Sequence, residues 1–264
     1  MAIITEDNLI AAVKANLTLK KTGGRTTVAN SPFSMWDVAG NPGAGTLAGT
    51  STTAGVVPTQ ATAGAPAIRS IGGANYAIGA IDFGSSVACR LRLFDMLWKG
   101  GAYAFNAGTS GNTPGSYSAR VPDGTDFTNL ELWVEQVTAA TGNQAVNVTY
   151  INESGTTGRT TGATGIGAAP TVGRMWQLPL QAGYKGVQGV TGVAGSVASA
   201  GTFNVLVMRP LWTGRVKIAN DGDVHGMDKT LLTPIYADTC LFLQAIPDST
   251  AAGVPELEIT LAVG

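Results

Sequence analysis

Alternation of apolar and polar residues is the main pattern in this chain, and it begins near residue 76. Apolar residues take every second position in Leu130–Glu135, Val146–Tyr150 and Leu257–Val263, which is the period of a strand with one buried face. Turn-forming residues separate the runs, and Thr141-Gly142-Asn143-Gln144 between two of them predicts a hairpin. Further strands are predicted at Tyr76–Phe83, Val87–Trp98, Ala102–Phe105, Arg174–Leu180, Phe203–Leu211 and Cys240–Ile246. About nine short strands with no second helix indicate an all-β protein, an antiparallel β-sandwich of the jelly-roll type.

The N-terminal region has a helical period instead. Leu9, Val13 and Leu17 share one face of a helix that we predict over residues 5–19. Thr5 stands where its side chain can cap the first turn. Because a helix of this length is not stable alone, it must pack against another part of the protein.

Residues 38–68 form a tract of Gly, Ala, Thr, Ser and Pro with almost no large apolar side chains. Such a tract cannot bury enough surface to form a core. It is either a flexible loop or an extended arm laid across a neighbouring subunit, where small side chains allow backbones to approach closely. We therefore divide the chain into an N-terminal helix and extended arm over residues 1–70 and a β-sandwich domain over residues 71–264.

Charge is scarce in this sequence. Charged residues make up 12% of the 264 residues, and the formal net charge is −1. This balance argues against binding of nucleic acid, which requires clustered positive charge, and against a basic membrane-surface protein. A monomer with so few charges is poorly protected against association, so we expect the chain to belong to an assembly. Cys89 and Cys240 lie in apolar runs and are interpreted as buried free thiols, with a disulfide left open.

The segment from Asp221 to Asp228 is the most ligand-like part of the sequence. Asp221, Asp223 and His225 are weak candidates for metal ligands, although a polar turn with an exposed histidine is the commoner structure. We expect no cofactor and no catalysis, because an enzyme would require this metal or a spatially paired set of carboxylates. Glu131 and Glu135 are interpreted as a solvated strand face, and Trp133 on that face either marks a contact surface or is buried between sheets.

A family resemblance rests on three blocks of residues. Residues 31–45, Ser-Pro-Phe-Ser-Met-Trp-Asp-Val-Ala-Gly-Asn-Pro-Gly-Ala-Gly, resemble a segment of tailed-bacteriophage virion proteins. Gly173–Val190 and Gly201–Leu211, with a Gly-rich turn and an Arg-Pro-Leu strand end, are similar to phage head or decoration proteins. Residues 31–45 and residues 173–211 together cover about a fifth of the chain.

The resemblance implies a structural component of the virion that assembles in the cytoplasm of the bacterial host and is not an enzyme. Within that class it favours a capsid decoration, or cement, protein that binds the lattice of the major capsid protein as a homo-oligomer, with a trimer as our expectation. Direct contact with nucleic acid or membrane is not expected. The alternatives are a tail protein, such as a tail-tube subunit, and a surface carbohydrate-binding or adhesin module presenting Trp133.

We expect residues 1–70 to make much of the contact between subunits, so that their deletion abolishes lattice binding and leaves the β domain folded. The individual side chains that we expect at partner contacts are Leu9, Val13, Leu17, Phe33, Trp36 and Trp133.

Overall fold

The computed structural model describes residues 3, 5–68, 75–106, 110–111, 116–168, 171–195 and 200–263. The chain divides into two compact units. Unit 1 consists of Met1–Gly45, Thr59–Phe94 and Leu211–Gly264, and unit 2 consists of Thr46–Pro58 and Asp95–Pro210. Residues 1–70, which the sequence analysis set apart, therefore contribute to both units. The division also falls inside two long strands, β6 (Cys89–Ala104) and β14 (Thr202–Val216).

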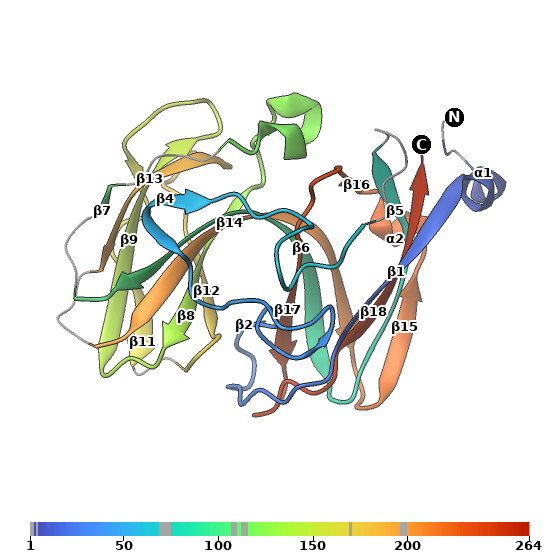
Figure 1. Cartoon of the computed structure of the whole chain (residues 1–264), viewed down its shortest axis with the longest axis horizontal. Coiled ribbons are helices and arrows are strands. Elements are labelled where there is room, and N and C mark those ends of the chain that lie inside the picture. The colour runs from blue at the N-terminus through green and yellow to red at the C-terminus, as the bar shows by residue number, and fades with distance from the viewer. Residues whose placement is uncertain are drawn as a thin grey trace. The chain divides into compact units, whose positions relative to one another are not determined.

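Unit 1 contains a six-stranded antiparallel sheet of strand order β15-β5-β18-β1-β3, in which β16 also pairs with β5 (Figure 1). Its strands are β1 (Val13–Lys21), β3 (Gly40–Asn41), β5 (Tyr76–Ser85), β15 (Asp221–His225), β16 (Pro234–Ile235) and β18 (Glu256–Val263). Two short helices, α1 (Glu6–Ala12) and α2 (Met227–Thr230), contact strands of this sheet. Among the described residues, neither helix is long and apolar enough to cross a membrane.

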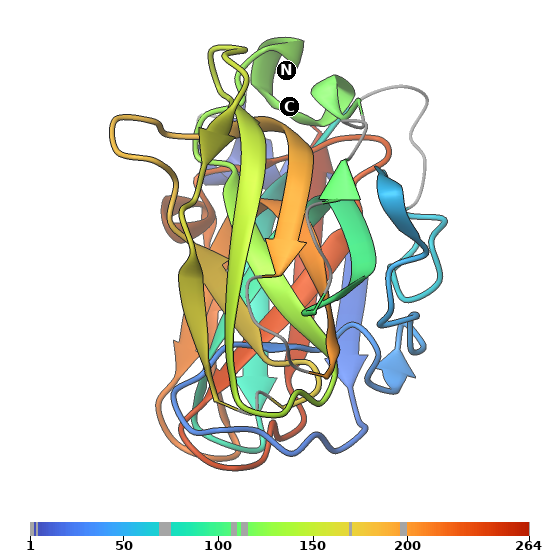
Figure 2. The same cartoon turned by 90° about the vertical axis from the view of Figure 1, so that its left-hand side faces the viewer.

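A seven-stranded sheet has the order β12-β8-β14-β6-β17-β2, with β4 also paired to β6. Its remaining strands are β2 (Phe33–Ser34), β4 (Ser51–Val56), β8 (Glu131–Thr138), β12 (Met175–Leu178) and β17 (Leu241–Pro247). A five-stranded sheet of order β10-β9-β13-β7, with β11 also paired to β9, belongs to unit 2 and faces the viewer in Figure 2. Its strands are β7 (Ser110–Gly111), β9 (Asn143–Asn152), β10 (Arg159–Thr160), β11 (Thr164–Ala168) and β13 (Val187–Gly195). Two single-turn 3-10 helices, η1 (Ser118–Arg120) and η2 (Pro122–Gly124), precede β8.

Each unit has its own core between two layers of strands. In unit 1, side chains such as Ile81 and Leu257 of the six-stranded sheet meet Leu91 and Leu243 of the seven-stranded sheet. In unit 2, residues such as Val148 and Val190 of the five-stranded sheet join one cluster with Val134 and Val205. The all-β antiparallel sandwich predicted from the sequence is thus confirmed, with three sheets where a jelly roll has two. Cys89 and Cys240 are buried and form no disulfide bond, as the interpretation of buried thiols predicted.

The predicted helix is correct only in its first half. The Thr5 side chain accepts a hydrogen bond from the Asn8 backbone N–H at 3.1 Å and caps α1 as expected. From Val13 the chain is strand β1, paired with β18 so that Leu17 lies opposite Ile259. A four-residue spacing suits a helix face and also one face of a strand. Pairing with a second strand decides between the two, because it satisfies the backbone groups of residues 13–21 and buries Leu19.

The predicted hairpin at Thr141–Gln144 is not formed. The turn joins β8 to β9, but β8 pairs with β12 and β14, whereas β9 pairs with β10, β11 and β13. The turn therefore carries the chain from one sheet to another. Both faces of β8 are covered, so its central residues are buried on both sides.

The interpretation of Glu131 and Glu135 as a solvated face is wrong for Glu135, which is fully buried in unit 2. Its carboxylate lies 3.5 Å from the Lys99 ammonium group and accepts a 2.7 Å hydrogen bond from the Asn204 side-chain amide. A buried carboxylate requires such partners, because burial of an unpaired charge costs several kcal/mol. The alternation of charged and apolar residues along β8 therefore does not show which of its side chains are exposed to solvent.

Part of the small-residue tract is held by unit 2. Asn204 donates to the Leu47 carbonyl at 2.7 Å and accepts from the Gly49 N–H at 2.8 Å, and the Trp98 indole donates to the Ala54 carbonyl at 3.2 Å. A side chain at Gly55 would meet the Trp98 ring at 2.3 Å. The small residues thus allow a close backbone approach as expected, but the segment they lie against belongs to their own chain.

Candidate functional site

The three weak candidates for metal ligands lie on an edge strand. Asp221, Asp223 and His225 alternate along β15, which pairs with β5 and ends the six-stranded sheet. His225 Nδ1 accepts a 3.0 Å hydrogen bond from the Trp212 indole N–H. Within the described residues, no three His, Cys, Asp or Glu side chains form a group that could hold a metal ion.

The aromatic residues expected at partner contacts belong to the core. Phe33 is fully buried, and Trp36 is buried and stacks on Phe242 with ring centroids 6.0 Å apart. Trp133 is only 2% exposed and donates its indole N–H to the Glu131 carboxylate at 2.7 Å. The structure therefore selects the buried alternative for Trp133, and these three side chains do not form an exposed surface on the chain.

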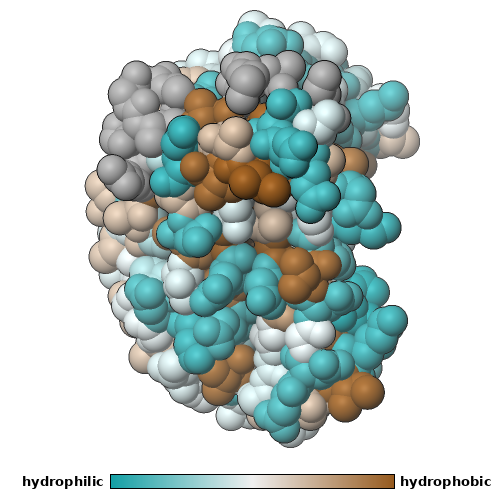
Figure 3. All heavy atoms as spheres, turned by 90° about the vertical axis from the view of Figure 1, so that its right-hand side faces the viewer, coloured by the Kyte–Doolittle hydropathy of each residue, from teal (hydrophilic) through white to brown (hydrophobic). Residues whose placement is uncertain are grey.

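Of the contact residues expected on the helix, Leu9 and Leu17 pack within unit 1, whereas Val13 is partly exposed. Leu9 lies against Gly79 of β5, where an added side chain would meet it at 2.7 Å, and Leu17 packs against the core of unit 1. Val13 is partly exposed, and its neighbour Ile10 is 67% exposed. Figure 3 shows this side of the molecule, where apolar patches (brown) are interrupted by polar residues (teal).

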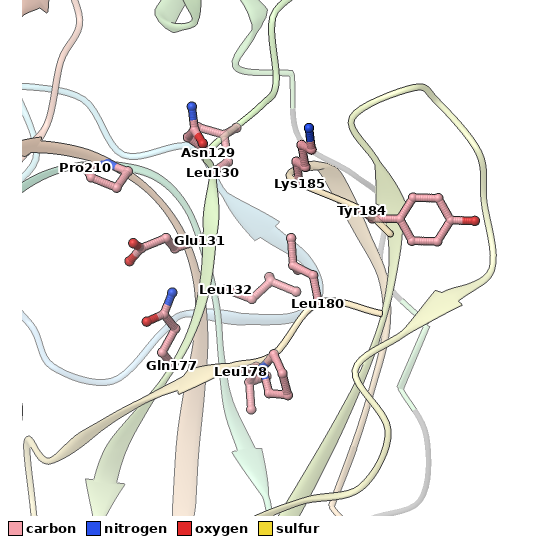
Figure 4. Close-up of a pocket in the computed structure, with 11 residues that line it drawn as sticks. Asn129, Leu130, Glu131, Leu132, Gln177, Leu178, Leu180, Tyr184, Lys185 and Pro210 are labelled. Atoms are coloured by element: carbon pink, nitrogen blue, oxygen red, sulfur yellow. The ribbon is translucent and has the colours of Figure 1, made fainter. Parts of the chain in front are cut away.

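Unit 2 contains a groove of about 700 Å³ (Figure 4). It lies where the start of β8 meets the end of β12 and the following loop. Figure 4 shows Leu132 and Leu180 on one side of β8, and the polar ends of Glu131 and Gln177 on its other side. The lining residues are Asn129, Leu130, Glu131, Leu132, Gln177, Leu178, Pro179, Leu180, Tyr184, Lys185 and Pro210.

Backbone hydrogen bonds fix the walls of the groove. The Asn129 N–H donates to the Lys185 carbonyl at 2.7 Å, and the Glu153 carboxylate accepts from the N–H groups of Lys185 and Gly186 at 3.2 and 3.1 Å. Gly186 is required for this approach, because a side chain there would lie 1.9 Å from the Phe127 carbonyl oxygen. The groove is therefore preformed, which lowers the entropic cost of binding.

Two buried tyrosine hydroxyls stabilise the chain around the groove through hydrogen bonds. The Tyr150 hydroxyl accepts a 2.9 Å hydrogen bond from the Gln181 N–H, and burial raises the pKa of Tyr150. The Tyr117 hydroxyl donates to the Val187 carbonyl at 3.1 Å, and burial raises the pKa of Tyr117 as well. Both groups remain protonated at neutral pH and act as hydrogen-bonding supports.

The chemistry of the groove suits binding of a protein surface. Buried Leu130 and Leu178 form an apolar floor, and exposed Gln177 and Lys185 form a polar rim, which is the usual anatomy of a protein interface. Glu131 is the one carboxylate among the described lining residues, and its hydrogen bond with Trp133 holds it in place.

Sequence reasoning did not identify this groove. Six of its lining residues lie between Gln177 and Lys185, and Pro210 is a seventh. Both segments belong to the blocks on which the sequence analysis based its expected family resemblance, so the sequence singled out these residues without indicating that they meet at one site. Only the pairing of β12 with β8 places these residues beside Asn129–Leu132.

Comparison with known proteins gives no family assignment. No family model matches the chain. No curated protein matches it. Among solved structures, the chain is similar to the VP2 subviral particle of infectious bursal disease virus, with 10% sequence identity, a TM-score of 0.17, and coverage of 100% of this chain and 83% of that chain. It is also similar to T=1 particles derived from infectious bursal virus, with 10% identity, a TM-score of 0.16, and coverage of 96% and 79%. Both neighbours are structures of virus-derived particles, and TM-scores this low do not define a common fold.

Proposed function

We propose that this chain is a structural component of a tailed-bacteriophage virion and acts by binding other virion proteins rather than by catalysis. The observation that carries the proposal is the groove of unit 2. Seven of its eleven lining residues belong to the two blocks whose sequence resembles phage head and decoration proteins, six to Gly173–Val190 and Pro210 to Gly201–Leu211. Residues that carry a family resemblance and meet at one preformed concave site are best explained as a shared contact surface.

Within that class, we propose a capsid decoration protein that binds the lattice of the major capsid protein through this groove. Such a protein stabilises the head by mass action, because it binds the assembled lattice and not the free subunits. A groove with an apolar floor gives each copy a modest contact, and many copies on one shell add their contacts through multivalency. Scarce charge fits a protein that functions within an assembly.

The test is co-sedimentation of the purified protein with empty phage heads, followed by electron cryomicroscopy of the pellet. A Gln177→Glu/Lys185→Glu variant changes the exposed rim of the groove and leaves its floor intact. We expect the unmodified protein to pellet with heads in regular density and this variant to remain in the supernatant. The matched control is Lys14→Glu/Lys229→Glu, two exposed positions in unit 1, which should pellet as the unmodified protein does.

Two outcomes contradict the decoration proposal. One is the absence of head binding by the unmodified protein, and binding to purified tails instead would favour a tail protein. The other is equal binding by the rim variant, which would remove the groove from the contact. The carbohydrate-binding alternative depended on an exposed Trp133, and the burial of that side chain removes its motivating observation.

A further inference from the structure

A second concave site lies in unit 1 and is strongly basic. This basic pocket of about 640 Å³ is lined by Arg90 and Arg92 of β6, by Thr213, Gly214, Arg215 and Lys217 at the end of β14, and by Asp223, His225 and Ile246. Four cations thus face one carboxylate in a chain whose formal net charge is −1. Such a local excess of one sign raises the local concentration of oppositely charged partners.

The cations form two pairs with the spacing of a strand. Arg90 and Arg92 are alternate residues of β6, and alternate residues on a strand lie on the same face about 6.6 Å apart. Arg215 lies on β14, and Lys217 directly follows the last residue of that strand. The Arg92 guanidinium lies over the Phe94 ring, 4.6 Å from its centroid, which directs its long side chain. The result is a small grid of positive charges.

The ion pair that Arg215 forms with Asp248 is weak. Arg215 lies 3.7 Å from Asp248, but both side chains are largely exposed, at 58% and 41%. An exposed ion pair of this kind contributes little stability and exchanges readily with another carboxylate. Arg215 is therefore available to an incoming anion.

His225 supplies an oriented donor beside these cations. Because its Nδ1 accepts the Trp212 indole N–H, the neutral ring carries its proton on Nε2. An edge-to-face contact with Phe83, at 4.9 Å between ring centroids, holds the plane of the imidazole. His225, which the sequence analysis considered as a metal ligand, therefore lies in a site that favours anions, because four cations repel a metal ion.

The spacing of the cations and the outer edge of β15 indicate the class of ligand. β15, which supplies Asp223 and His225, pairs with β5 and stands at the end of its sheet, so its outer edge presents backbone groups to an added extended chain. A peptide with an acidic residue at every second position has the same spacing as the two cation pairs. Nucleic acid is disfavoured, because the described lining residues include no Phe, Tyr or Trp on which a base could stack.

We propose that the basic pocket binds an extended segment of a partner protein that carries carboxylates at alternate positions. The segment lies along β15, with its carboxylates on Arg90, Arg92, Arg215 and Lys217 and with the Nε2–H of His225 as a further donor. This site belongs to unit 1 and does not depend on the groove in unit 2.

The test is fluorescence anisotropy with a labelled peptide of alternating Asp and Thr residues. We expect saturable binding that weakens at least tenfold when salt rises from about 50 to about 500 mM, as screening requires. Arg92→Gln/Arg215→Gln should weaken binding at least tenfold, and so should Lys217→Gln/Arg90→Gln, which changes only exposed side chains and preserves packing. Lys14→Gln/Lys229→Gln removes the same charge elsewhere in unit 1 and should leave binding unchanged.

Three results would overturn the proposal. The first is equal binding of a peptide with Asn in place of Asp. The second is that both pocket variants bind the peptide with the affinity of the unmodified protein, while circular dichroism shows that they are folded. The third is tighter binding of a single-stranded DNA oligonucleotide, or full displacement of the peptide by equimolar inorganic phosphate, either of which would assign the pocket to phosphate.

Discussion

Asn204 attaches segment 46–58 to the rest of unit 2. Its side chain is fully buried and makes hydrogen bonds to the Leu47 carbonyl, the Gly49 N–H and the Glu135 carboxylate. An Asn204→Ala substitution removes all three bonds. At about 1 kcal/mol for each neutral bond and about 2 kcal/mol for the bond to the carboxylate, we expect a loss of about 4 kcal/mol.

Scanning calorimetry and limited proteolysis measure this loss. For a protein of this size, about 4 kcal/mol corresponds to a fall of about 10 °C in Tm. Proteolysis by thermolysin should also accelerate at the segment, which contains the apolar residues Leu47 and Val56. The matched control is Asn16→Ala, the same change at an exposed position on β1, which should alter stability by no more than about 0.5 kcal/mol.

The reasoning would be refuted if Asn204→Ala melted within about 1 °C of the unmodified protein and its segment 46–58 resisted thermolysin equally well. That result would mean that the observed hydrogen bonds do not hold the segment. A fall in Tm with unchanged proteolysis would refute the local part of the prediction, because the loss would then be spread over the core of unit 2.

Three further predictions concern titration, reactivity and truncation. Burial raises the folded-state pKa of Tyr117 above its unfolded value of 10.0. The stability that this protonated hydroxyl contributes is therefore present below about pH 10 and is lost as the pH rises further. Urea unfolding at pH 8 and about pH 11 should show this loss of stability in the unmodified protein and a smaller loss in Tyr117→Phe. Cys89 and Cys240 are buried, and burial raises the pKa of Cys89, so both should react with a thiol reagent only after denaturation, and reaction of either in the native protein would contradict this. Deletion of residues 1–12 should leave unit 1 folded by near-UV circular dichroism, whereas deletion of residues 1–21 removes β1 from the six-stranded sheet and should unfold it; a folded 1–21 deletion would show that β1 is dispensable.

The truncation prediction corrects an expectation from the sequence. The sequence analysis expected the β domain to survive loss of residues 1–70. The structure places β1 between β18 and β3, and segment 46–58 against Asn204 and Trp98. Loss of the whole region would therefore remove β1, β2 and β3 from unit 1 and the packed segment that contains β4 from unit 2.

The sequence by itself determined the fold class and most of the strands. Strict alternation in residues such as Leu257–Val263 has a single structural meaning once one face must be buried, and turn residues mark where such runs end. A capping threonine likewise specified where α1 begins, because the cap is a local interaction between Thr5 and Asn8. Local interactions of this kind are readable from spacing alone.

Tertiary structure decided what each strand pairs with and which charges are buried. Residues 13–19 fit both a helix and a strand, and the available partner β18 settled the choice. Glu135 looked solvated because its burial depends on Lys99 and Asn204, which are distant in the sequence. The groove and the basic pocket each join segments far apart in the chain. Such sites depend on strand order, and strand order is set by the summed burial of whole faces rather than by any short motif.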